Sequence, residues 1–89
     1  MNSNKNWGIK IDEVVYKELN RFPQKDRDRI ISVIDGPIFN PYSGDIEKVK
    51  GEQNTWRRRI GSYRIFYEVQ KKRGFIHIFR VERRTSNTY

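Results

Sequence analysis

The sequence predicts a small α+β fold in the order βααβββ, an antiparallel sheet with an N-terminal helical hairpin packed on one face. Three observations support this fold class. Apolar residues recur at helical spacing between residues 12 and 35. From residue 55 onward there are three strand-like runs, of which the first two alternate between inward apolar and outward polar or charged positions. Short glycine-containing turns separate these runs, which makes them antiparallel neighbours. We expect residues 1–89 to form one domain.

The first two elements follow from the N-terminal pattern. Residues 7–11 alternate apolar and small or polar side chains, which predicts a short strand with its apolar members, Trp7, Ile9 and Ile11, facing the core. Asp12 is a suitable N-cap for a helix of about ten residues. The apolar stripe of that helix has the spacing i, i+4, i+7 and consists of Val15, Leu19 and Phe22.

The second helix is predicted to begin at Pro23, because proline in a first turn loses no helical hydrogen bond. Its buried face consists of Ile30, Ile31, Val33 and Ile34. Gly36 suits a left-handed C-cap, and Pro37 blocks continuation of the helix. The following segment, residues 39–45, is rich in turn formers and predicts a connecting loop.

Three strands complete the fold, over Thr55–Ile60, Tyr63–Gln70 and Phe75–Glu82. Residues 61–62 form the first hairpin turn and residues 71–74 the second. The last strand is apolar on both faces, which is typical of a strand in the middle of a sheet.

Positive charge is concentrated in the second half of the chain. The formal net charge is +8, and residues 1–44 contain seven Lys/Arg against six Asp/Glu. Residues 45–89 contain twelve Lys/Arg against five Asp/Glu. Like charges repel at strand spacing, so this density indicates an anionic partner, most simply a polyphosphate chain.

Strand alternation divides the basic segment between two faces. Trp56 and Ile60 face the helices, whereas Arg57, Arg59 and Arg64 project from the uncovered face. Arg58 falls on the core side and must extend its charged end past the core edge. An alternative is an ordinary solvated face, with the arginines paired locally to Glu52, Glu68 or Glu82.

Several function classes are excluded by composition. The chain has no cysteine and one histidine, so neither a disulfide framework nor a thiolate or histidine metal cluster can form. His77 is interpreted as a packed or surface residue. No apolar run approaches the ~20 residues of a membrane span, and the N-terminus lacks a signal-peptide core. We therefore expect a cytoplasmic protein without a metal, a cofactor or a membrane.

Three segments together carry a family resemblance. Residues 40–45 (Asn-Pro-Tyr-Ser-Gly-Asp), 48–51 (Lys-Val-Lys-Gly) and 56–67 (Trp-Arg-Arg-Arg-Ile-Gly-Ser-Tyr-Arg-Ile-Phe-Tyr) resemble the RelE/ParE toxin superfamily of toxin–antitoxin systems. The tail, residues 80–89, resembles the end of RelE-type members. The similarity covers essentially the whole chain and includes the order of the predicted elements.

The resemblance implies the toxin component of a type II toxin–antitoxin system. Such a toxin enters the A site of the 30S ribosomal subunit, cleaves mRNA there without a metal, and so inhibits translation. An acidic cognate antitoxin holds it inactive in a toxin–antitoxin hetero-oligomer. The catalytic residues implied by the resemblance are Arg59, Arg64, Arg84 and Tyr89. The residues expected to bind RNA are Lys48, Lys50, Arg57 and Arg83.

The sequence departs from the RelE pattern at its basic positions. RelE proteins usually have lysine at the positions of Arg57 and Arg59, and lysine can lose a proton when its pKa is lowered. Arginine cannot serve as a base, because its pKa is above about 12. Either Arg59 lowers the pKa of the RNA 2′-hydroxyl electrostatically, or the enzyme is slow. Glu82 is a second departure, because glycine is common there.

Two other functions remain open. One is a ParE-like toxin that inhibits DNA gyrase by binding it. The other is a degenerate member that serves only as an antitoxin-binding partner. The arginine set together with Tyr89 favours the endoribonuclease, because gyrase inhibition does not require a sheet face that holds phosphate.

Overall fold

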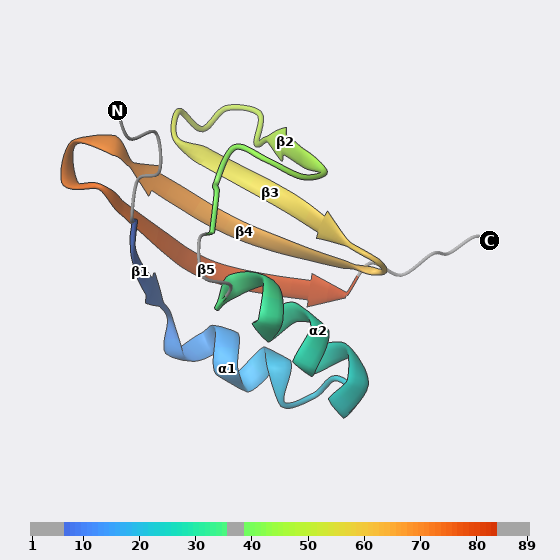
Figure 1. The fold of residues 1–89 in the computed structure, drawn as a ribbon. Coiled ribbons are helices and arrows are strands. Elements are labelled where there is room, and N and C mark those ends of the chain that lie inside the picture. The colour runs from blue at the N-terminus through green and yellow to red at the C-terminus, as the bar shows by residue number, and fades with distance from the viewer. Residues whose placement is uncertain (1–6, 36–38, 84–89) are drawn as a thin grey trace.

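The computed structural model describes residues 7–35 and 39–83. The helices are α1 (Glu13–Leu19) and α2 (Gln24–Ile34). The strands are β1 (Gly8–Ile11), β2 (Ile46–Lys48), β3 (Thr55–Ile60), β4 (Tyr63–Gln70) and β5 (Phe75–Arg83), with a 3₁₀ turn at Lys71–Arg73. The predicted α+β class and the order of its elements are confirmed (Figure 1). The short strand β2 follows the predicted loop of residues 39–45 directly and was not predicted.

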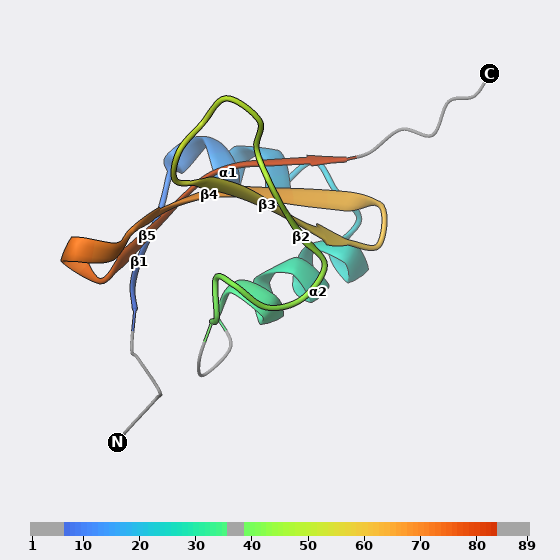
Figure 2. The ribbon, with the colours of Figure 1, turned by 90° about the horizontal axis from the view of Figure 1, so that it is seen from above.

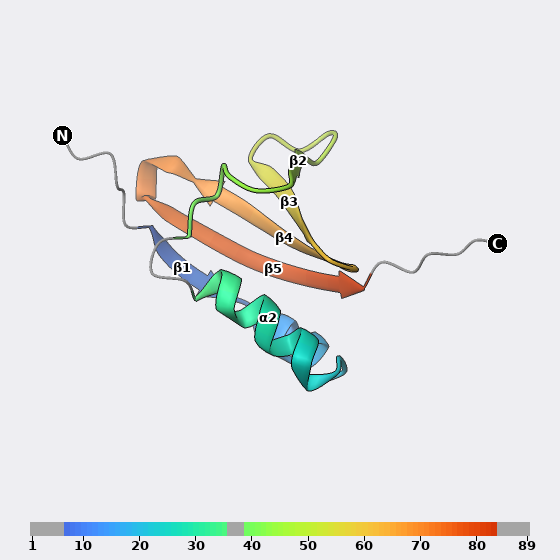
Figure 3. The ribbon, with the colours of Figure 1, turned by 45° about the vertical axis from the view of Figure 1, so that its right-hand side comes forward.

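The strands form one sheet in the order β1-β5-β4-β3-β2. β3, β4 and β5 are antiparallel neighbours, as predicted, and β2 is also antiparallel to β3. β1 pairs with β5 in parallel, so the sheet is mixed. In Figures 1 and 3, both helices lie on the β1–β5 side of the sheet, and β2 and β3 form its other edge.

The core lies between the helices and one face of the sheet. In β4, buried residues alternate with partly exposed ones along the whole strand, which confirms its predicted apolar face. The helices contribute Val15 and Leu19 from α1 and Ile30 and Ile34 from α2. In Figure 2, α2 lies on one side of the strands and the loop that joins β2 to β3 rises on the other.

Ile9 lies on the core face, since it is the ladder partner of buried Ile76, but the residue is 37% exposed and so adds little to the core. β1 is an edge strand, so no further strand shields Ile9 on its outer side. Trp7 and Ile11 are partly buried against the core, as expected. Ile31 and Val33 are also only partly buried.

The ends of the helices differ in detail from the prediction. Asp12 occupies the N-cap position of α1, but its side chain makes no capping hydrogen bond. α1 has seven residues rather than about ten, and Phe22 follows it in the turn and packs on Tyr63 with 4.6 Å between ring centroids. Pro23 is the N-cap of α2 and lies just before its first turn. The predicted cap at Gly36 and Pro37 lies outside the described residues.

Candidate functional site

Three arginines of β3 and β4 lie on the face of the sheet that is opposite to the core. Arg59 and Arg64 are direct cross-strand partners, and Arg57 is opposite Phe66. Because Ile60 is buried on the other face, its neighbour in sequence, Arg59, points away from the core. The three arginines line a depression of about 100 Å³ together with Asp45 and Glu47. We call this surface the arginine depression.

The two carboxylates come from the segment that leads into β3. Glu47 is on β2, directly opposite Arg57, and its Oε1 accepts hydrogen bonds from Arg57 Nε at 3.1 Å and Nη2 at 2.6 Å. The hydrogen bond and charge of Arg57 hold the pKa of Glu47 below its usual value. Asp45 is more loosely placed, with its Oδ2 3.6 Å from Arg59 Nε. The backbone N–H of Arg59 donates to the Asp45 carbonyl oxygen at 2.8 Å.

Arg64 continues the basic surface toward β5. Its Nη1 lies 3.4 Å from Oε2 of Glu82, while Oε1 of Glu82 lies 2.8 Å from Nη2 of Arg80. Arg80 also lies over the ring of Phe66, 5.6 Å from its centroid. A register shift between Phe66 and the next residue pairs Phe66 with Arg80, which brings this arginine onto the same face.

The alternative of local charge pairing is partly realised. Glu82 contacts Arg64 as that alternative expected, whereas Glu68 lies near His77 instead, with 4.0 Å between Oε1 and Nδ1. Each arginine of the depression has a carboxylate nearby, but Glu82 is shared with Arg80, so four arginines on this face have three carboxylates and an excess of positive charge remains. Half of the Arg59 side-chain surface is exposed to solvent. An anion can therefore reach this guanidinium without unfolding any element.

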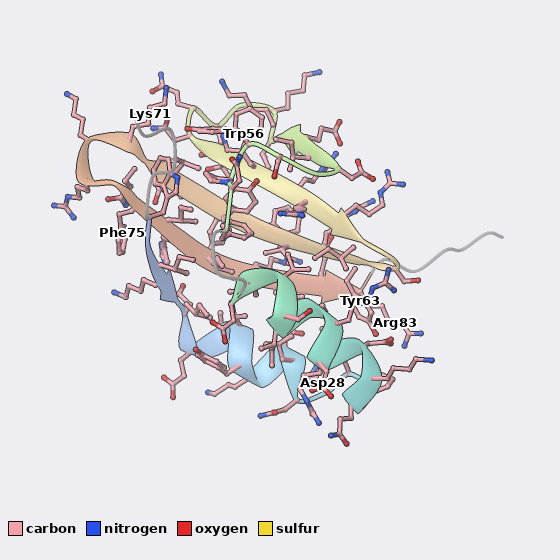
Figure 4. All side chains as sticks on the ribbon, viewed as in Figure 1. Asp28, Trp56, Tyr63, Lys71, Phe75 and Arg83 are labelled. Atoms are coloured by element: carbon pink, nitrogen blue, oxygen red, sulfur yellow. The ribbon has the colours of Figure 1, made fainter. Side chains whose placement is uncertain are left out.

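The structure separates other predicted RNA contacts from this depression. Lys48 and Lys50 are exposed and line a different hollow, formed by residues 47–53 at the β2 edge. Arg83 is opposite Tyr63 in the β4–β5 ladder, and its guanidinium lies 5.9 Å from the centre of that ring, on the core side of the sheet (Figure 4). Arg84 and Tyr89, which the resemblance implies as catalytic, lie outside the described residues.

Arg58 reaches past the edge of the core, as predicted. Its guanidinium lies 5.7 Å from the centre of the Phe39 ring and packs against Gly44, whose φ is +88°. A side chain at Gly44 would come within 2.8 Å of this guanidinium. Gly44 therefore lets the loop approach β3 closely enough to place Asp45 in the depression.

His77 lies on the same face as the arginines but farther along the sheet. Its Nε2 is 2.7 Å from Asp12 Oδ1, so the carboxylate expected to cap α1 instead joins the end of β1 to β5. Glu68 lies near the second ring nitrogen. His77 is partly buried and its ring contacts groups from both sides, which agrees with its interpretation as a packed residue.

Sequence reasoning did not find Asp45, Glu47 or Arg80. A three-residue strand such as β2 has too little alternation to be recognised, so the opposition of Glu47 and Arg57 was hidden. Arg80 was hidden by the irregularity in the β4–β5 register, which interrupts simple alternation. The signal for Asp45 and Glu47 that the sequence did offer is that these two acidic residues precede the basic strand β3.

Within residues 7–35 and 39–83, no group of three or more His, Cys, Asp or Glu side chains is arranged to hold a metal ion. In the same part of the chain, no helix is both long enough and apolar enough to cross a membrane.

Comparisons with known proteins identify the fold and family. The family model described as the ParE toxin of the type II toxin–antitoxin system parDE matches residues 10–88. No curated protein sequence matches the chain. Among solved structures, a chain of the RelB–RelE antitoxin–toxin complex from Methanococcus jannaschii is 31% identical, with a TM-score of 0.68 over 82% of this chain and 87% of that chain.

Two further structures have the same fold. A chain of the archaeal RelE–RelB complex from Pyrococcus horikoshii OT3 is 26% identical, with a TM-score of 0.76 over 92% of this chain and 99% of that chain. The isolated E. coli RelE toxin is 16% identical, with a TM-score of 0.65 over 91% of this chain and 87% of that chain. The family match across residues 10–88 and these structural similarities place the chain in the RelE/ParE superfamily of type II toxin–antitoxin toxins, with the fold of its RelE-type members.

Proposed function

We propose that this toxin is a ribosome-dependent, metal-independent endoribonuclease that cleaves mRNA in the ribosomal A site and so inhibits translation. The observation that carries the proposal is the direct opposition of Arg59 and Arg64 in a depression on the uncovered sheet face. Two like charges at this spacing are unfavourable without an anion between or above them. A phosphodiester is an anion whose charge increases during cleavage, so such a site favours its transition state over its ground state.

The chemistry assigned to this surface is cleavage by the RNA's own 2′-hydroxyl. The 2′-hydroxyl gives its proton to water or to a group of the ribosomal RNA, and the 2′-oxygen attacks the adjacent phosphorus to form a 2′,3′-cyclic phosphate. The bond from phosphorus to the 5′-oxygen breaks, and that oxygen takes a proton from water. Arg64 is suited to hold the phosphate oxygens through two N–H groups, a contact that strengthens as negative charge develops. Arg59 acts electrostatically and lowers the pKa of the 2′-hydroxyl, since a guanidinium cannot accept a proton. The proposal includes Arg84 and Tyr89 as a second phosphate contact and a base-stacking group.

The proposal includes an acidic antitoxin as the cellular partner, bound in a hetero-oligomer. Two of the similar structures are toxin–antitoxin complexes, from M. jannaschii and P. horikoshii. A chain with a formal net charge of +8 and an exposed basic face favours an acidic protein partner for the same electrostatic reason that it favours RNA.

Gyrase inhibition is the second candidate, because the matching family model is described as a ParE toxin. Inhibition by binding alone does not depend on a pair of arginines placed to hold one phosphate. The two candidates therefore differ in what they require of Arg59 and Arg64. A member without either activity, retained only for antitoxin binding, is the third possible outcome.

The test is a cell-free translation reaction analysed by primer extension, run beside a DNA supercoiling assay. We expect breaks within ribosome-bound mRNA, no loss of supercoiling, and loss of the breaks with Arg64→Ala. Arg21→Ala removes an equal charge from an exposed position just after α1 and is the matched control. Intact mRNA with blocked supercoiling would assign the protein to gyrase, and inactivity in both assays would indicate the third outcome.

A further inference from the structure

We propose that Glu47 is an intramolecular competitor for RNA phosphate at the arginine depression. By holding Arg57, it weakens the binding of free RNA and so makes the toxin depend on additional contacts for productive binding. This inference rests on the proposed function, because it takes RNA as the anion that the arginines bind.

The geometry of the pair supports a competitor. Both Arg57 N–H contacts, at 3.1 and 2.6 Å, go to the same Glu47 oxygen, Oε1. A carboxylate and a phosphate accept hydrogen bonds from a guanidinium in the same fork geometry. A phosphate that approaches the Nε–Nη2 edge of Arg57 must therefore displace Glu47; otherwise only the Nη1 side of the guanidinium remains open to it.

The surroundings make the displacement possible but unfavourable. The Glu47 side chain is 67% exposed and belongs to the outermost strand, so it can swing away without disturbing the core. Once displaced, it stays close to the bound phosphate and repels it. Asp45 lines the same depression 3.6 Å from Arg59 and repels an incoming phosphate in the same way, although it holds its arginine less closely.

Salt dependence separates this role from a general effect of charge. An arginine that neutralises a phosphate releases cations condensed on the RNA, which contributes a slope of about −0.7 to log K against log salt for single strands. While Arg57 stays paired with Glu47 it neutralises no phosphate, so it adds nothing to this slope. Removing the Glu47 charge should therefore add one phosphate contact to the salt slope.

The experiment measures binding of a labelled single-stranded RNA oligonucleotide to the full chain by fluorescence anisotropy, between about 50 and 200 mM salt. Glu47→Gln is compared with Glu52→Gln, which makes the same charge change five residues away. Glu52 takes part in no ion pair among residues 7–35 and 39–83. A third variant combines Glu47→Gln with Arg57→Ala.

We expect Glu47→Gln to bind RNA about fivefold more tightly at the lower salt concentration, with a slope steeper by about 0.7. Glu52→Gln should keep the wild-type slope. Adding Arg57→Ala to Glu47→Gln should reverse both gains, because the arginine that was freed is now absent. Circular dichroism spectra that coincide with wild type show that the variants are folded.

Three results overturn the inference. If wild type and Glu47→Gln bind RNA with equal affinity and slope, Glu47 is not a competitor, although the RNA-binding face stands. If neither binds RNA even at low salt, the inference and the proposed function fail together. If Glu47→Gln loses mRNA cleavage without binding RNA more tightly, Glu47 takes part in the chemistry instead.

Discussion

Arg59 of β3 and Arg64 of β4 are direct partners across antiparallel strands. Like charges in this position lower stability, and the neighbouring carboxylates compensate only partly, at 3.6 Å for Arg59 and 3.4 Å for Arg64. A stability-driven sequence would place β-branched or oppositely charged residues there. The proposed function explains the pair as a binding feature that is retained at some cost in stability.

Replacement of one member should separate stability from function. Arg59→Thr removes the repulsion and places a good strand former in β3, so the free energy of unfolding should rise by about 0.5 kcal/mol. The same change should lower mRNA cleavage by about tenfold or more, because one phosphate contact is lost. Urea unfolding and cleavage of translated mRNA measure the two effects. A variant that is both less stable and fully active contradicts this explanation of the pair.

Tyr67 links the centre of the sheet to the loop before β2. Its side chain is fully buried and its hydroxyl donates to the carbonyl oxygen of Pro41. Tyr67→Phe leaves that buried acceptor without its partner and should lower the free energy of unfolding by about 1–3 kcal/mol. Thermal and urea unfolding at neutral pH measure the loss. A change below about 0.3 kcal/mol would show that the hydrogen bond is unimportant.

The same residue predicts a dependence on alkaline pH. Burial raises the pKa of Tyr67 from 10.0 to about 12. Between these values the unfolded chain loses a proton that the folded chain keeps. The contribution of Tyr67 to the free energy of unfolding is therefore complete below pH 10.0 and is lost as pH rises through about 12. Burial and the hydrogen bond to Asp26 shift the pKa of Tyr63 in the same direction. Stability measured from pH 9 to 12 should fall less steeply for Tyr67→Phe than for wild type.

The loop glycines allow a matched comparison. Gly44 and Gly51 have nearly equal positive φ values, +88° and +86°, so alanine should cost about 1 kcal/mol at either position. At Gly44 the new Cβ would also meet the Arg58 guanidinium at 2.8 Å, whereas at Gly51 nothing lies within 4 Å. Gly44→Ala should therefore lower the unfolding temperature more than Gly51→Ala. Equal effects would mean that Arg58 moves aside without loss.

The Asp12–His77 contact should matter for stability and not for cleavage. Asp12→Ala removes the 2.7 Å contact that joins the end of β1 to β5, and should lower the free energy of unfolding by about 1 kcal/mol. His77→Ala should leave mRNA cleavage nearly unchanged, because His77 does not line the arginine depression. A large loss of cleavage with His77→Ala would require a new account of proton transfer.

The regular parts of this fold could be predicted from the sequence because their apolar residues recur at a fixed strand or helix spacing. Alternation from Tyr63 to Gln70 identified the core face of β4, and the helical spacing of Val15 and Leu19 identified the buried side of α1. Long strands with one buried face have a strongly specified register, so the shared face of Arg57, Arg59 and Arg64 could also be predicted.

Features set by tertiary position could not be predicted in this way. β2 has three residues and is defined only by its pairing with β3, so the ion pair between Glu47 and Arg57 had no signature in the local pattern. Ile9 is apolar but exposed because β1 is at the edge of the sheet. Arg83, at the end of β5, is the first of two consecutive arginines in the sequence, yet its position beside Tyr63 depends on the register after the irregularity in the β4–β5 pairing.

Cleavage of mRNA on programmed ribosomes by purified toxin is the most direct test of the arginine depression as an RNA-cleaving surface. Wild type is compared with Arg64→Ala and with Arg21→Ala in single-turnover reactions. The account predicts cleavage by wild type and Arg21→Ala, and a rate at least about tenfold lower for Arg64→Ala. Equal rates for wild type and Arg64→Ala, or no cleavage by any of the three, would contradict it.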